Sequence, residues 1–199
     1  AHPEVVESSV FSGCSSGLYF PSVPVIVRMA KSSFSSSRSK KMETEAPVLY
    51  SKEFLDEVQP NLRMTGMQYI TQPFSHSPFS DDESTFGASI AQLAACLTHF
   101  VSVERMNEIK KAGIPTLAIH GTIDATIPFS HGKYLAEHLN SEFHPVEGAS
   151  HNIFIEREEE VYQTIIDFLL RVPQINENRA IQMVTEDPDN ETQEEQKTE

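Results

Sequence analysis

The chain has 199 residues, 12 phenylalanines and no tryptophan, and it is long enough for one domain with a sizeable core. Its formal net charge of −14 opposes binding to nucleic acid, and no stretch approaches the ~18 apolar residues of a membrane span. We therefore expect no stable membrane insertion. Cys14 and Cys96 are too few for a disulfide framework, so we expect reduced thiols. The location stays open, with the cytoplasm favoured.

Residues 1–17 predict one strand of a sheet and a tight turn after it. Val6 to Ser12 is a short run with the composition of a strand. The turn reads Gly13–Cys14–Ser15–Ser16–Gly17, which fits the pattern G-x-S-x-G. In that pattern a sharp turn exposes a nucleophilic serine ahead of a helix. Ser15 is therefore a candidate nucleophile.

Residues 18–100 are expected to form a separate, mainly helical insertion. The basic, Ser-rich stretch at 32–39 suggests a mobile, solvated loop. A short helix is predicted over 51–58, with Ser51 as its N-cap, and two prolines indicate a loop at 73–84. Residues 86–100 predict a longer helix.

Residues 101–173 alternate between helix and strand, which is typical of a parallel sheet with crossover helices. Ser102 predicts the cap of a helix that ends at Lys111, with Ile109 pointing inward. Strands are predicted at Pro115–His120 and Phe143–Val146, with a helix from about Ser130 to Asn140 between them. A final helix is predicted from Arg157 to Val172, with its apolar side on the sheet: Val161, Ile165, Ile166, Phe168, Leu169 and Leu170.

One acidic residue and one histidine follow the two strands of this last region. Asp124 comes just past the turn at Gly121, and His151 follows the turn at Gly148. The carboxyl ends of parallel strands meet at one edge of the sheet, where open α/β sheets carry their chemistry. A carboxylate there can fix the tautomer of an imidazole and stabilise its positive charge, which a general base needs. The spacing therefore predicts an acid and base pair.

This arrangement resembles the C-terminal part of an α/β-hydrolase, in which nucleophile, acid and histidine follow one another along the chain. The resemblance implies an α/β fold with a partial, mostly parallel sheet, and a lid formed by residues 18–100. It implies Asp124 as the catalytic acid and His151 as the base. It also implies hydrolysis of a small-molecule substrate, an apolar ester or a similar compound, without a cofactor or a metal. The lid would select the substrate, whose identity the sequence does not reveal.

The nucleophile is the missing member of this set. Pro21 and Pro24 oppose a helix directly behind Ser15. The opening residues resemble instead the strand that follows the nucleophile in these enzymes, which implies a fragment whose nucleophile lies upstream of Ala1. Ser15 as the nucleophile stays open as an alternative. A non-catalytic binding or scaffold protein of the same fold is the alternative function.

The remaining segments are expected to have structural roles or none. His120, His131, His138 and His144 lack the spacing of metal ligands, and we interpret them as structural, with His120 near the site. Residues 174–199 are acidic and poor in apolar residues at their end, which predicts a disordered tail.

Overall fold

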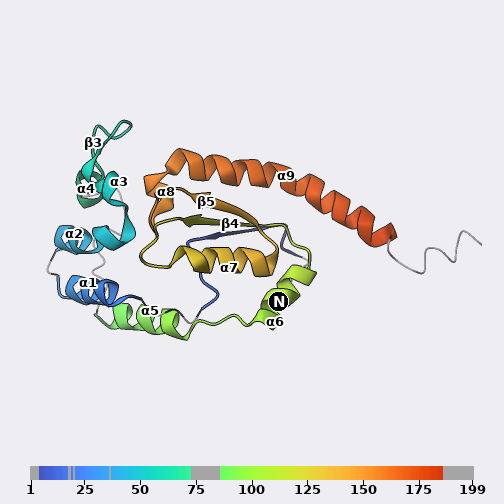
Figure 1. The fold of residues 1–199 in the computed structure, drawn as a ribbon, viewed down its shortest axis with the longest axis horizontal. Helices are drawn as coiled ribbons and strands as arrows, with labels where there is room; N and C mark the ends of the chain where they lie inside the picture. Colours follow the sequence, from blue (N-terminus) through green and yellow to red (C-terminus); the bar gives the residue numbers. More distant parts are fainter. Residues whose placement is uncertain (1–4, 18, 20, 36, 73–85, 186–199) are drawn as a thin grey trace, which may run out of the picture.

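The computed structural model describes residues 5–17, 19, 21–35, 37–72 and 86–185. Its centre is a parallel sheet of three strands in the order β1, β4, β5, with helices on both faces (Figure 1). The strands are β1 (Ser9–Ser12), β4 (Thr116–Gly121) and β5 (Glu142–Val146). The predicted α/β class with a partial parallel sheet is therefore confirmed. The three strands lie at or close to the predicted ranges 6–12, 115–120 and 143–146.

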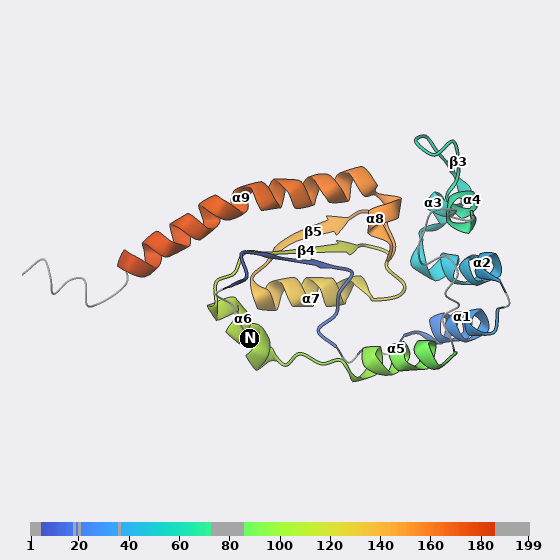
Figure 2. The same cartoon turned by 180° about the vertical axis from the view of Figure 1, so that it is seen from behind.

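Strand β4 is the centre of the core, and all of its residues are buried. Successive side chains of a strand point to opposite faces, so β4 is packed on both sides. Leu117 and Ile119 pack against α8 (Ile153–Glu156) and α9 (Glu158–Thr185), together with Val146, Ala149, Ile153, Val161, Phe168 and Val172. On the other face, helix α7 (Phe129–Leu139) covers the sheet, as Figure 2 shows from behind.

Helix α7 approaches β4 closely because position 132 is glycine. A Cβ atom on Gly132 would lie 2.3 Å from Nδ1 of His120, which is far inside contact distance. Helix α6 (Val103–Lys111) packs on α7 and starts at the predicted cap, because Ser102 Oγ accepts from Arg105 N–H. The prediction that Ile109 points inward from α6 was wrong, because Ile109 is 38% exposed and Met106 is the buried residue.

A helical segment with a core of its own lies between β1 and α6. The buried residues of this core cluster are Ala46, Tyr50, Phe54, Leu55 and Ile70. Ser51 caps α3 as expected, because its Oγ accepts from Phe54 N–H. The elements of the segment are α1 (Val23–Ser33), α2 (Arg38–Leu49), α3 (Lys52–Asp56), β2 (Val58–Gln59), β3 (Met64–Thr65), α4 (Gly66–Thr71) and α5 (Phe86–Thr98).

The prediction of a mobile loop at 32–39 was wrong, because this stretch ends α1 and begins α2. Ser32 is only 1% exposed and its hydroxyl donates to Glu45. Ser37 caps α2 by accepting from Lys40 N–H. Pro24 lies in the first turn of α1, where a missing N–H is harmless, so proline does not prevent a helix there.

Helix α9 corrects two expectations about the end of the chain. It continues through Pro173 to Thr185, so residues 174–185 are helical and not a disordered tail. Asn176 Nδ2 anchors this part by donating to Glu7 O at 3.2 Å. Of the predicted packing face, Ile166, Leu169 and Leu170 are exposed. The loop predicted at 73–84 and the tail at 186–199 lie outside the described residues.

None of the helices in the described ranges is long and apolar enough to cross a membrane.

Candidate active site

The loops after β4 and β5 lie side by side because the strands are parallel neighbours. Backbone hydrogen bonds join the two loops: Thr122 N–H donates to Val146 O and Ile123 N–H to Ala149 O, each at 3.1 Å. Asp124 belongs to the first loop and His151 to the second. The sheet register thus brings both residues to the carboxyl edge of the sheet.

The two side chains are in direct contact. His151 Nδ1 donates to Asp124 Oδ2 at a distance of 2.8 Å. The Asp124 side chain is fully buried, whereas that of His151 is 26% exposed. A proton on Nδ1 leaves the lone pair on Nε2, which is the form that a general base requires. The contact expected from the spacing of Asp124 and His151 is therefore present.

The N–H groups around Asp124 keep it ionised. Its Oδ1 accepts from the N–H groups of Thr126, at 2.7 Å, and Ile127, at 2.8 Å. Burial alone would raise the pKa of Asp124, but hydrogen bonds from His120 and His151, the charge of His151 and the Ile127 N–H outweigh it and lower the pKa to about 2. The carboxylate is therefore negative throughout the neutral range.

His120 lies directly behind the acid, as expected of a structural neighbour. It is 1% exposed, and its Nε2 donates to Ile127 O at 2.9 Å and lies 3.4 Å from Asp124 Oδ2. The same ring nitrogen thus holds the carboxylate and the loop around it. Among the described residues, His120 Nδ1 is the buried side-chain nitrogen or oxygen that has no hydrogen-bond partner.

The GCSSG turn passes beside His151, but its serine points elsewhere. Gly13 has a φ of +55°, and a Cβ there would lie 3.3 Å from His151 Cε1, so the turn packs against the imidazole ring. Ser15 Oγ contacts His131 Nδ1 at 3.2 Å and accepts from Gly17 N–H at 2.9 Å. The only histidine contact found for Ser15 Oγ among the described residues is therefore with the α7 residue.

The contacts found for the other histidines do not involve Asp124 or His151. The His131 ring packs edge-on against Tyr19, with 5.1 Å between the ring centroids. His138 Nδ1 donates to Tyr134 O at 2.8 Å, and His144 Nε2 lies 2.9 Å from Glu160 Oε1. Across the part of the chain that the structure describes, no group of three or more His, Cys, Asp or Glu residues could hold a metal ion.

Sequence reasoning missed how the helical segment meets the two loops. Thr126 Oγ1 donates to Val48 O at 2.9 Å, and Asn152 N–H donates to Leu49 O at 3.0 Å. These acceptors are backbone carbonyls, which every residue type supplies, so no sequence pattern could have revealed them. The 48–51 junction between α2 and α3 is thus part of the surroundings of the pair.

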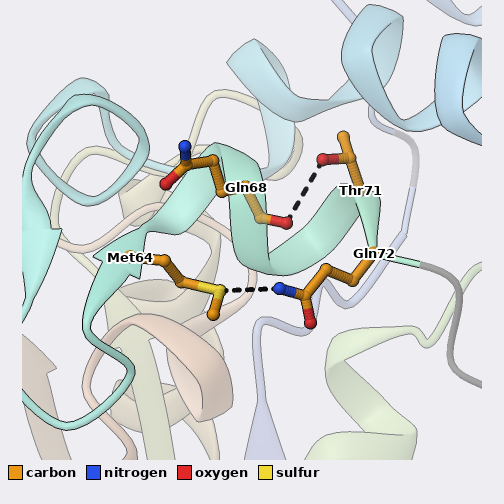
Figure 3. A pocket seen from close by; sticks show the side chains of 4 residues that line it. All are labelled: Met64, Gln68, Thr71 and Gln72. Carbon is orange, nitrogen blue, oxygen red and sulfur yellow. Dashed lines mark hydrogen bonds between the residues drawn. The ribbon is translucent and has the colours of Figure 1, made fainter.

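An open cavity of about 480 Å³ lies at β3 and α4, away from the pair. It is lined by Met64, Gln68, Thr71 and Gln72 (Figure 3). Gln72 Nε2 donates to Met64 Sδ across it at 2.9 Å. None of these side chains titrates near neutral pH or contacts Asp124 or His151, so we assign no chemistry to this cavity.

No family model and no curated protein matches the sequence. Solved structures do match the fold. One of them is MGS-M2, an α/β-hydrolase enzyme from a Medee basin deep-sea metagenome library. The match covers 84% of this chain and 57% of MGS-M2, at 17% identity and a TM-score of 0.59. The 2-hydroxy-6-oxo-6-phenylhexa-2,4-dienoate hydrolase of Rhodococcus sp. strain RHA1 matches 84% with 57% of its own chain, at 14% identity and a TM-score of 0.60. The enol-lactonase of Burkholderia xenovorans LB400 matches 82% with 56% of its own chain, at 18% identity and a TM-score of 0.56.

The chain therefore spans somewhat more than half the length of the structures that it matches. The resemblance first seen at Asp124 and His151 is confirmed at the level of the fold. Over the part that it spans, this chain has the α/β-hydrolase fold.

Proposed function

We propose that this chain carries the acid and the base of a hydrolase that acts on a small-molecule ester or a similar compound. The observation that supports it most is the 2.8 Å contact between Asp124 Oδ2 and His151 Nδ1 at the carboxyl ends of adjacent parallel strands. The structures similar to this chain include a hydrolase and an enol-lactonase, which is consistent with this class of reaction.

In this proposal His151 moves the proton. Its Nε2 takes a proton from the attacking hydroxyl group or water and later gives it to the leaving group. The ionised Asp124 holds the Nδ1–H tautomer and stabilises the imidazolium that forms in between. Because the carboxylate accepts from several donors and its pKa is about 2, it stays negative while the imidazole becomes positive.

The nucleophile in this proposal belongs to polypeptide outside these 199 residues, and the helical segment acts as the lid. The contact of Ser15 Oγ with His131 supports this interpretation over Ser15 as the nucleophile. The share of about 57% that the chain spans of its structural relatives agrees with it. The helical segment adjoins both loops through the 48–51 junction, where a lid would shape the entrance for an apolar substrate.

The experiment compares the 199-residue chain with a longer polypeptide that includes it. A fluorophosphonate probe should leave the 199-residue chain unlabelled and label the longer one. The longer polypeptide should hydrolyse an activated short-chain ester, and His151→Ala should lower turnover by about 10⁶, because removing one member of such a set removes its joint effect.

His138→Ala is the matched control, because the contacts found for its ring among the described residues are with Tyr134, on its own helix. It should leave turnover unchanged. Stoichiometric labelling of the 199-residue chain that disappears in Ser15→Ala would show that Ser15 is the nucleophile. A longer polypeptide with no hydrolysis and no labelling would favour a non-catalytic binding protein.

A further inference from the structure

A second buried carboxylate, Glu156, lies beside the histidine turn. It belongs to α8, is 6% exposed, and each of its oxygens accepts a backbone hydrogen bond. Oε1 accepts from Ser150 N–H at 2.9 Å, and Oε2 accepts from Ser51 N–H at 3.0 Å. Ser150 directly precedes His151, and Ser51 is the N-cap of α3. One side chain therefore bridges the histidine turn and the helical segment.

The bridge is the centre of a larger set of contacts at the 48–51 junction. On one side, Thr126 Oγ1 from the Asp124 loop donates to Val48 O. On the other side, Asn152 N–H from the histidine turn donates to Leu49 O. In Figure 1 the same place appears as the approach of α2 and α3 to α8. The junction thus touches the loop of the acid and the turn of the base at once.

The chemistry of the bridge requires a carboxylate. Both partners are N–H donors, so both side-chain oxygens must accept. A glutamine would turn its amide nitrogen toward one of the two donors and lose that bond. Burial raises the pKa of Glu156, and the hydrogen bonds of Ser51 and Ser150 and the charge of Arg157 oppose this rise. Burial is the main cause that raises the pKa of Tyr50 in the helical segment, and the charge of Glu156 adds to it.

We propose that Glu156 is a positioning residue for the Asp124–His151 pair. One oxygen holds the backbone directly before His151 and the other holds the 48–51 junction, and this keeps the imidazole at its contact with Asp124. Docking of the helical segment and orientation of the base are then one event. The inference rests on the proposed function for its significance, but its test needs no catalytic activity.

The first test uses Glu156→Gln in the 199-residue chain. The proton on His151 Nδ1 should give a far-downfield, slowly exchanging NMR signal, assigned by its loss in Asp124→Asn. Glu156→Gln should broaden or remove this signal. It should also speed hydrogen exchange of the Asn152 amide, which donates to Leu49 O, about tenfold or more, because the adjacent bridge loses a hydrogen bond to the charged carboxylate. Glu159→Gln, an exposed position on the following helix, should change neither.

The second test removes the bridge from its other end and does not depend on the folding of Glu156→Gln. Ser51 has a φ of −67°, which proline can adopt, and Tyr50 before it is extended. Ser51→Ala and Ser51→Pro both lose the capping hydroxyl, but only Ser51→Pro loses the N–H that donates to Glu156. The His151 signal should weaken in Ser51→Pro relative to Ser51→Ala.

Equal signals and equal Asn152 exchange in the Ser51 pair, or a Glu156→Gln variant that matches wild type in both measurements, would overturn the proposal. That result is independent of the ester assays, because a failure of the proposed function appears there as absent hydrolysis. The positioning role fails only when loss of the Glu156 bridge leaves the His151 Nδ1–H signal and the Asn152 exchange rate unchanged.

Discussion

The sheet and the helical segment are stabilised by separate clusters of buried side chains. Around β4 the cluster joins strands to α8 and α9, and Phe168 is its largest member at 1% exposure. In the helical segment Phe54, also 1% exposed, packs with Tyr50 and three aliphatic residues. The two regions meet through hydrogen bonds to the backbone of the 48–51 junction, from both backbone and side chains. Because the two cores are separate, we expect that the helical segment can loosen while the sheet stays folded.

The largest expected effect compares one phenylalanine from each cluster. Phe168→Ala should lower the free energy of unfolding by about 4 kcal/mol, since it leaves a large cavity among strands and helices. Phe54→Ala removes the same volume but should speed hydrogen exchange mainly in α2 to α4, leaving β4 and β5 protected. Thermal unfolding and residue-resolved exchange measure the two responses. Equal loss of protection in both regions would mean one cooperative core.

The next effect concerns Asp124, whose carboxylate lies at the edge of the sheet. Asp124→Asn should lower stability at neutral pH by about 3 kcal/mol, because it breaks a buried network and leaves donors unpaired. The folded-state pKa of about 2 is below the unfolded value, so the ionised carboxylate stabilises the fold at neutral pH. About 2 kcal/mol of this should disappear as the pH falls from about 4 to about 2.

Urea denaturation at several pH values measures this contribution. For wild type, the free energy of unfolding should fall as the pH decreases from about 4 to about 2. For Asp124→Asn, the free energy of unfolding should change less over the same pH range. A variant with the same slope as wild type would show that Asp124 does not control acid stability.

A smaller effect should follow from filling the space between α7 and β4. Gly132→Ala would put a methyl group against His120, and we expect a loss of about 1–3 kcal/mol from overpacking. Gly148→Ala is a useful comparison, because its Cβ would meet only the Arg157 guanidinium at 3.7 Å, although its φ of +68° adds strain. Chemical denaturation of both variants separates close packing from backbone strain.

The sheet region was predictable because its signals are local. Glycine turns after short apolar strands, and a carboxylate and a histidine at matching positions, fix the frame around Asp124 and His151. The helical segment was harder: the serines at 32–39 looked solvated, yet Ser32 is buried by packing that no local pattern encodes. Helix α9 passes Pro173, and beyond it Asn176 bonds to the distant Glu7 O, a tertiary contact that no local pattern encodes. Glu156 escaped notice because its partners are backbone amides.

The pairing of β1 with β4 has a consequence for the order of folding. Ser9 pairs with Thr116, so the two strands close a loop that contains the whole helical segment, whereas β4 and β5 are joined by α7 alone. Loop-closure entropy grows with the logarithm of loop length, and contacts between nearby residues form first. Strand β1 should therefore dock late in folding, after β4, α7 and β5 have assembled. Because Gly13 follows β1 directly, the turn beside His151 should be among the last parts of the site to take shape.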